Sequence, residues 1–189
     1  MKQLLFIFFT LILHSAFFIH HSSAGVIQLP QTGQTKCYDT VGAEIDCAGT
    51  GQDGNLRAGV PWPNPRFSVS GSCVTDNLTG LMWYRYGYFA DTWQNAVDLI
   101  NNFSMCGYSD WRLPNIRELK TLINHQQSNS ANWLKSQGFE YVSGGYYWSS
   151  SSYIHDTGSA WCVQMTDGSV WPISKTNYRE WVLGVRMGQ

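Results

Sequence analysis

The sequence predicts an α+β domain in which a β-hairpin is followed by two helices and then by a cluster of strands. Two capped, amphipathic segments lie in the middle of the chain, and short strand-like segments with tight-turn residues lie on both sides of them. Aromatic residues make up 15% of the 189 residues and 18 residues are glycine. This composition suits a loop-rich domain with strands, and it excludes a disordered chain, a coiled coil or an ordinary helical bundle.

Residues 1–24 have the pattern of a secretory signal peptide. Lys2 precedes an apolar run over residues 4–13, and the small residues Ser22, Ser23 and Ala24 end the segment. About ten clean apolar residues fall short of the roughly 20 that a membrane span needs. We therefore expect cleavage after Ala24 and export to the periplasm, the cell surface or the medium. No cysteine follows the cleavage site directly, so no lipid anchor is expected.

The mature chain would contain 165 residues with 11 basic and 13 acidic side chains, a net charge of −2. This length is sufficient for one domain with its own core. A nucleic-acid-binding protein would show a basic stripe, and the sequence has none, so no nucleic-acid partner is expected. No second apolar segment reaches spanning length, so no membrane span is expected after cleavage.

All five cysteines follow the predicted cleavage site, where an oxidising compartment favours disulfides. Cys37 and Cys47 are the closest pair, and the glycine-containing stretch between them suits a hairpin. Cys73, Cys106 and Cys162 leave three choices for a second bridge, with one thiol remaining. Neither a Cys-x-x-Cys motif nor a histidine cluster accompanies them, so a zinc site is not expected.

The chain divides into a loop-rich lead-in, residues 25–70, and a domain-like part, residues 71–189. The proline-rich stretch at residues 61–65 favours an extended, polyproline-like conformation in the lead-in. The domain begins with a predicted hairpin, in which residues 72–76 and 81–84 form strands on either side of a turn.

Two helices are predicted next, each with a recognisable start. Thr92 caps the first, and Asn115 caps the second with Glu118 three residues later, as in a capping box. The buried stripes are Trp93, Ala96, Val97 and Ile100 in the first helix and Ile116, Leu119, Leu122 and Ile123 in the second. Pro114 keeps the chain extended before the second cap.

Strand patterns return in the last fifty residues. The pair Asp167 and Gly168 indicates a tight turn between two of these strands. The predicted strands are residues 145–149, 160–165, 169–173 and 181–186. Together with the first hairpin they are expected to form short antiparallel sheets on which the two helices pack.

Groups of residues spread along the chain resemble, in order and spacing, one known family. They are residues 79–83, Trp93 with Ala96, residues 107–115, 118–119, 122–123, 147–150 and 160–161, Gly168 and residues 185–186. The set closely resembles the Lcl C-terminal domain family, which is named for a bacterial collagen-like adhesin. Residues 32–39, Cys47 and residues 50–54 also resemble the segment that often precedes this domain in exported bacterial proteins.

The resemblance implies a C-type-lectin-like fold related to the formylglycine-generating-enzyme group. It also implies a role in adhesion, since the adhesin that names the family binds sulfated glycosaminoglycans. A binder of sulfated polyanions normally presents clustered lysine and arginine. Here the basic residues are scattered and the mature chain is slightly acidic. The resemblance therefore supports the fold more strongly than it supports that ligand.

The cluster Asp110, Trp111 and Arg112 is interpreted as structural. We expect Arg112 to pair with Asp110 or Glu118, which would hold the loop on the second helix while Trp111 fills the core. The residues assigned to structural roles of this kind are Trp83, Asp110, Trp111, Arg112, Glu118, Trp148 and Trp161.

No catalytic residue is predicted. The serine run at residues 149–152 lacks the Gly-x-Ser-x-Gly elbow of hydrolases, and only His125 and His155 could serve as a base. The serines are expected to bond to backbone groups at a strand end. The formylglycine-generating enzymes depend on a reactive cysteine pair, but Cys106 and Cys162 have no cysteine nearby in sequence. A structural disulfide and a buried thiol are expected instead.

A calcium ion is kept as an open alternative, although no cofactor is required by the sequence. Calcium needs several converging oxygen ligands, and no spaced run of aspartates provides them. The weak candidates are Asp53, Asn55, Asp156 and Asp167.

The two late loops, residues 153–158 and 175–180, are the predicted ligand-binding face, because loops on a rigid scaffold commonly carry function. The candidate residues are His155, Asp156, Trp171, Asn177, Tyr178 and Arg179. The leading hypothesis is an exported, non-catalytic binding module that recognises a glycan or a surface protein. The alternatives are a divergent enzyme of the formylglycine-generating type and a purely structural envelope protein.

Overall fold

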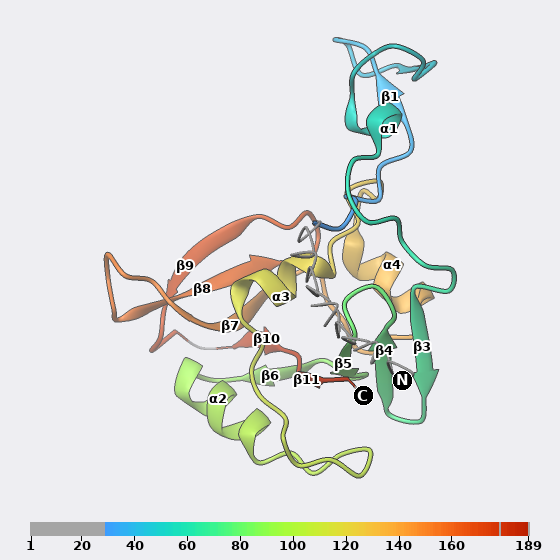
Figure 1. Cartoon of the computed structure of the whole chain (residues 1–189). Helices are drawn as coiled ribbons and strands as arrows, with labels where there is room; N and C mark the ends of the chain where they lie inside the picture. The colour runs from blue at the N-terminus through green and yellow to red at the C-terminus, as the bar shows by residue number, and fades with distance from the viewer. Residues whose placement is uncertain (1–28, 178, 189) are drawn as a thin grey trace, which may run out of the picture.

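The computed structural model describes residues 29–177 and 179–188 of the chain (Figure 1). The predicted signal peptide and the candidate ligand residue Tyr178 lie outside the described residues. Within them, no helix is long and apolar enough to cross a membrane.

The described residues contain four helices, whereas the sequence predicted two, so this part of the fold prediction is wrong. They are α1 (Asp53–Leu56), α2 (Trp93–Asn101), α3 (Ile116–Thr121) and α4 (Ser130–Ser136). The predicted helices are α2 and α3. α1 is a single turn and is too short to display a repeating apolar stripe. α4 buries only two apolar residues, Ala131 and Leu134, so its stripe is not distinctive in the sequence.

The strands form two larger sheets and a two-stranded ribbon (Figure 1). The ribbon pairs β1 (Cys37–Tyr38) with β2 (Glu44–Ile45). One sheet has the order β6 (Tyr88–Ala90), β10 (Glu180–Val182), β7 (Tyr146–Ser152), β8 (Ser159–Gln164) and β9 (Val170–Ser174). The other has the order β11 (Val185–Met187), β5 (Leu81–Tyr84), β4 (Cys73–Asp76) and β3 (Phe67–Ser70). The mixed composition of strands and few helices agrees with the predicted class.

Local signals located the predicted elements correctly. The Thr92 side chain accepts a hydrogen bond from the Asn95 amide (3.2 Å), which caps α2. Asn115 and Glu118 form the complete capping box of α3: Asn115 Oδ1 accepts from the Glu118 amide (3.0 Å), and Glu118 Oε2 accepts from the Asn115 amide (2.8 Å). The predicted first hairpin is β4 and β5, with Val74 opposite Trp83.

The last predicted strand, residues 181–186, is in fact two strands in different sheets. β10 belongs to the five-stranded sheet and β11 to the four-stranded sheet. A Cβ atom on Gly184, between them, would lie 3.4 Å from the Ile100 side chain and 3.5 Å from Trp111. The chain therefore passes close to α2 as it changes sheets. β10 also pairs in parallel with β7, through Trp181 and Tyr147, so the expectation of purely antiparallel sheets is wrong.

Two buried clusters hold these layers together. The first gathers Trp83, Leu119 and Tyr147 with the residues around α3 and α4. The second lies against α2 and includes Ile100 and Trp148. Each such side chain is fully buried, and burial of one large apolar side chain contributes about 1.5–3 kcal/mol.

Two disulfides add covalent links. The predicted bridge between Cys37 and Cys47 is present, and it closes the small lobe formed by β1, β2 and α1 that projects from the larger sheets (Figure 1). The second bridge joins Cys73 to Cys106, which resolves the three choices left by the sequence. Cys162 remains a buried free thiol. Disulfides of this kind are typical of proteins outside the cytoplasm.

Candidate functional site

The Asp110–Trp111–Arg112 segment is held by two separate ion pairs. Arg112 donates to both oxygens of Glu118 (2.6 and 2.7 Å), and Asp110 accepts from Arg186 (2.7 and 3.2 Å). Burial raises the pKa of Glu118, but the hydrogen bonds from Arg112 and from the Asn115 amide outweigh it, so the net pKa is lowered. Trp111 is buried and donates to backbone carbonyls. Arg112 thus holds the loop on α3, and Asp110 holds it on β11.

The serine run is likewise engaged in hydrogen bonds within the protein. Ser149 is buried, its hydroxyl donates to the Trp161 carbonyl (2.6 Å), and the Ser151 hydroxyl accepts from the Ile116 amide (3.2 Å). Trp148 packs inward, and Trp161 is half-buried on the neighbouring strand. The serines thus join β7 to β8 and to the start of α3.

The cysteines do not form a reactive pair. Cys106 is bonded to Cys73, and Cys162 is fully buried within the cluster beside α2. Burial, together with the nearby carboxylate of Glu180, raises the pKa of the Cys162 thiol strongly. The thiol is therefore protonated and shielded, which suits a packing role.

The two late loops contact each other. The Lys175 amide donates to the Gly158 carbonyl (2.8 Å), and its ammonium donates to the Thr157 carbonyl (3.0 Å) and to the Ser152 hydroxyl (2.8 Å). The Asp156 carboxylate is used in its own turn, where it accepts from the Ser159 hydroxyl (2.7 Å). Because this hydrogen bond occupies one carboxylate oxygen, Asp156 has fewer free acceptor positions for a ligand.

The other late-loop candidates have mixed surroundings. His155 lies edge-on to Tyr153, and the Asn177 amide donates to Glu180 (3.1 Å). Trp171 is 58% exposed on β9, and Arg179 is exposed. A ligand-binding role for the late-loop face stays a prediction.

The weak calcium candidates are separated along the fold. Asp53 and Asn55 lie in α1, where the Asp53 carboxylate accepts from the Thr32 hydroxyl. Asp167 accepts from the Ser169 amide (2.8 Å) in its predicted turn, and this bond lowers its pKa. Among the described residues no group of three histidine, cysteine or acidic side chains is placed to hold a metal ion. Calcium stays the open alternative that it was from the sequence.

A first hollow that sequence reasoning missed lies beside three aromatic residues, Phe89, Tyr141 and Trp181, which we call the aromatic patch. The hollow has a volume of about 420 Å³. Its lining is Lys135, Tyr141, Val142, Ser143, Gly144 and Trp181.

Close backbone packing builds the aromatic patch. The rings of Phe89 and Trp181, opposite each other on β6 and β10, are 3.8 Å apart between centroids. Tyr141 is 71% exposed and has a φ of 53°, a left-handed conformation that is unusual for an aromatic residue. A Cβ on Gly87 would lie 2.6 Å from the Tyr141 carbonyl oxygen, so a glycine is needed where these segments meet.

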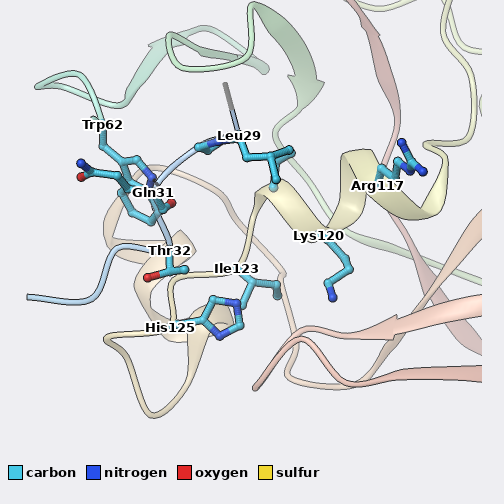
Figure 2. Close-up of a pocket in the computed structure, with 10 residues that line it drawn as sticks. Leu29, Gln31, Thr32, Trp62, Arg117, Lys120, Ile123 and His125 are labelled. Atoms are coloured by element: carbon cyan, nitrogen blue, oxygen red, sulfur yellow. Dashed lines mark hydrogen bonds between the residues drawn. The ribbon is translucent and has the colours of Figure 1, made fainter. Parts of the chain in front are cut away.

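A second hollow, which we call the basic groove, lies between the lead-in and α3 (Figure 2). Its volume is about 280 Å³. Its lining is Leu29, Pro30, Gln31, Thr32, Trp62, Arg117, Lys120, Thr121, Ile123 and His125. Figure 2 shows Lys120 and His125 on either side of Ile123, with Arg117 further along the helix. Sequence patterns did not predict this hollow, because its walls come from three segments that are distant in the chain: residues 29–32, Trp62 and residues 117–125.

Comparison with known proteins assigns the larger part of the chain to a family. A search of curated proteins found no match. The sequence model of the Lcl C-terminal domain matches residues 72–186, which include both larger sheets except β3 and part of β11, together with α2, α3 and α4. The resemblance expected from the sequence is thus confirmed, and the chain belongs to the Lcl C-terminal domain family.

Proposed function

We propose that the protein is an exported, non-catalytic binding module with a C-type-lectin-like fold, which recognises a glycan through the aromatic patch. The observation that carries this proposal is the exposure of Phe89 and Tyr141 beside a hollow with polar groups in its lining. Large aromatic side chains are normally buried, so a group of exposed rings marks a binding surface.

The chemistry of the hollow suits a sugar. The C–H faces of a sugar ring pack on aromatic faces, and the exposed rings of Tyr141 and of Phe89, which packs on Trp181, supply such faces. Lys135 and Ser143 in the same lining can bond to hydroxyl groups. A few polar groups among apolar walls is the usual composition of a ligand pocket.

The conformation of Tyr141 supports a binding role. A non-glycine residue in a left-handed conformation costs about 1–3 kcal/mol, and such strain often occurs at functional sites. Its ring is largely exposed, so the ring adds little packing energy to offset that cost. A role of the exposed Tyr141 ring in binding a ligand would explain why the strained backbone conformation is kept.

We propose a non-catalytic role because the side chains that could be reactive are occupied by contacts within the protein. The serine run, the Asp110 and Arg112 side chains and Cys106 are engaged in contacts within the protein. The alternative of a formylglycine-type enzyme requires a reactive thiol. A thiol reagent should modify no cysteine in the folded protein and one cysteine, Cys162, after unfolding; rapid labelling of the folded protein would favour the enzyme.

The family and the disulfides support export and the lectin-like fold. The family resemblance implies both, and two disulfides are stable in an oxidising compartment. The signal-peptide pattern of residues 1–24 points the same way.

A glycan array tests the function. The oxidised protein is screened with calcium and again with a chelator, beside the variants Phe89→Ala and Tyr141→Gly. Control variants on the late-loop face are Trp171→Ala and Asn177→Ala. Selective binding that is lost in the first two variants and kept in the controls supports the aromatic patch. Loss in the controls alone would assign the glycan to the late loops, and a blank array in both conditions would contradict glycan recognition.

A further inference from the structure

We propose that the basic groove is a docking site for an extended, acidic peptide segment of a partner protein. This site is separate from the aromatic patch, and the inference does not depend on glycan recognition. It rests on the charge of the lining, the linear arrangement of that charge, and the aliphatic character of the remaining wall.

The groove contains basic side chains that the protein itself does not neutralise. Arg117, Lys120 and His125 line it, and no acidic residue does. Five other basic side chains form ion pairs among the described residues: Lys36, Arg66, Arg85, Arg112 and Arg186. Arg117 and Lys120 form none within those residues, and neither do Arg57, Lys135, Lys175 and Arg179. Arg117 and Lys120 differ from those four in lying together in the lining of a hollow that has no acidic residue, an arrangement that favours an anionic ligand.

The basic side chains follow a line. Arg117 and Lys120 are three residues apart on α3 and so lie on one side of the helix, separated by about 4.5 Å along its axis. His125 continues the line beyond the helix end, on the far side of Ile123 (Figure 2). A small single anion would need charges that converge on one point. A row of charges instead suits an extended chain that carries an acidic group at intervals.

The rest of the wall favours a peptide over a sugar chain. Leu29 and Pro30 are exposed and provide an aliphatic surface, whereas Ile123 is buried at the base of the groove. The indole of Trp62 already packs against the Arg66 guanidinium, 4.0 Å from the ring centroid, and against Trp133. Its N–H donates to the Gln31 carbonyl (2.8 Å). The ring is thus engaged in structural contacts, whereas aliphatic side chains of a peptide can pack on the aliphatic surface.

The groove is fixed by hydrogen bonds between its walls. The Val60 amide donates to the Leu29 carbonyl (2.8 Å), the Gln31 amide to the Val60 carbonyl (3.0 Å), and the His125 amide to the Thr32 carbonyl (3.0 Å). These backbone groups are occupied, so a peptide would bind through its side chains and not by adding a strand. A preformed wall also reduces the ordering cost of binding.

The probe for this proposal is a short labelled peptide of alternating glutamate and leucine. In an extended peptide, alternate side chains point to opposite sides, so one side is acidic and the other aliphatic. The matched control peptide has glutamine in place of glutamate. Fluorescence anisotropy with the oxidised full chain should show binding of the acidic peptide that is roughly tenfold tighter than that of the control and that weakens as salt is added.

Charge-reversal variants locate the site. The double variant Arg117→Glu/Lys120→Glu should weaken binding of the acidic peptide roughly tenfold or more. The control is Lys135→Glu/Arg179→Glu, which makes the same change in net charge outside the groove and should leave binding nearly unchanged. Arg117→Gln/Lys120→Gln, with a smaller electrostatic perturbation, should show an intermediate loss, and near-ultraviolet circular dichroism checks the fold of each variant.

Three results would overturn the proposal. They are equal binding of the acidic and control peptides, an equal effect of the groove and control variants, and binding of an oligosaccharide of uronic acids in place of the peptide. The last result would assign the groove to an acidic glycan.

Discussion

The aromatic patch with its hollow and the basic groove are two surfaces of one small protein, and they differ in charge, in side-chain composition and in the elements that form them. The aromatic patch presents the exposed rings of Phe89 and Tyr141 next to a hollow of about 420 Å³. The basic groove presents cationic and aliphatic side chains where the lead-in crosses α3, with a hollow of about 280 Å³. The comparison shows that two surfaces of the same domain can differ in chemistry, because each is built by a different set of helices, strands and loops.

The two hollows also differ in their relation to the family. All residues of the aromatic patch and its hollow fall within the matched region, residues 72–186. One wall of the basic groove is formed by residues 29–32 and by Trp62, which precede that region. The groove therefore exists only where a lead-in of this kind lies on α3, whereas the aromatic patch can be built by the domain alone.

The largest expected effect comes from breaking the buried ion pair that supports the groove. Arg66 and Asp76 are almost fully buried, and Arg66 also donates to the Thr121 carbonyl in the groove lining. Asp76→Ala leaves the guanidinium without its partner, so the free energy of unfolding should fall by about 3–5 kcal/mol. Denaturant unfolding measures this loss.

The matched control for that experiment is Glu44→Ala, because Glu44 pairs with Lys36 on the surface. An exposed pair contributes about 0–1 kcal/mol, so the control should be nearly neutral. If Asp76→Ala were as mild as the control, the buried pair would not be the support of the groove.

A smaller effect is expected from the ion pair that holds α3. The net pKa of Glu118 lies below its ordinary value of 4.5, because hydrogen bonds to its charged form outweigh burial. A carboxyl group with a lowered folded-state pKa adds stability above the unfolded-state pKa, and this stability is lost as the pH falls through the folded-state value. Glu118→Gln should therefore cost about 1–2 kcal/mol at pH 7 and progressively less below pH 4.5.

Unfolding measured from pH 7 down to acid pH tests this dependence. The difference between the two proteins should shrink on acidification. A difference that grew toward acid pH would mean that Glu118 is stabilised in its protonated form, opposite to the direction given by its contacts with Arg112 and Asn115.

The smallest effect on stability, with the opposite sign, is expected at the aromatic patch. Tyr141→Gly removes an exposed ring and relieves the left-handed backbone conformation, so the free energy of unfolding should stay level or rise by up to about 1 kcal/mol. Glycan binding should still fall, since the ring is lost. A loss of stability above about 1 kcal/mol would show that the ring serves packing.

Local signals explain what could be predicted from the sequence. Thr92 and Asn115 cap their helices through groups within three residues, and Asp167 accepts within two, so short patterns suffice. Glu118 was one of the two partners expected for Arg112, because the two residues are only six apart in the sequence. Asp110, however, pairs with Arg186, which is 76 residues away.

What the sequence could not reveal depends on long-range contacts. Cys73 and Cys106 are 33 residues apart and are brought together by the fold. Phe89, Tyr141 and Trp181 come from three separate segments, and nothing in the neighbouring sequence indicates that Phe89 and Tyr141 are exposed. The predicted strand at residues 181–186 was divided because the chain changes sheets at Gly184, an event that strand periodicity does not record.

The central claim is that the protein carries two independent binding surfaces of different chemistry. Isothermal titration calorimetry tests it directly, with the acidic peptide and the glycan selected by the array, each titrated into the unaltered protein, Tyr141→Gly and Arg117→Glu/Lys120→Glu. The account predicts that Tyr141→Gly loses only the glycan and that the double variant loses only the peptide. Loss of both ligands in either folded variant would contradict the account, because it would mean that the two hollows act as one site.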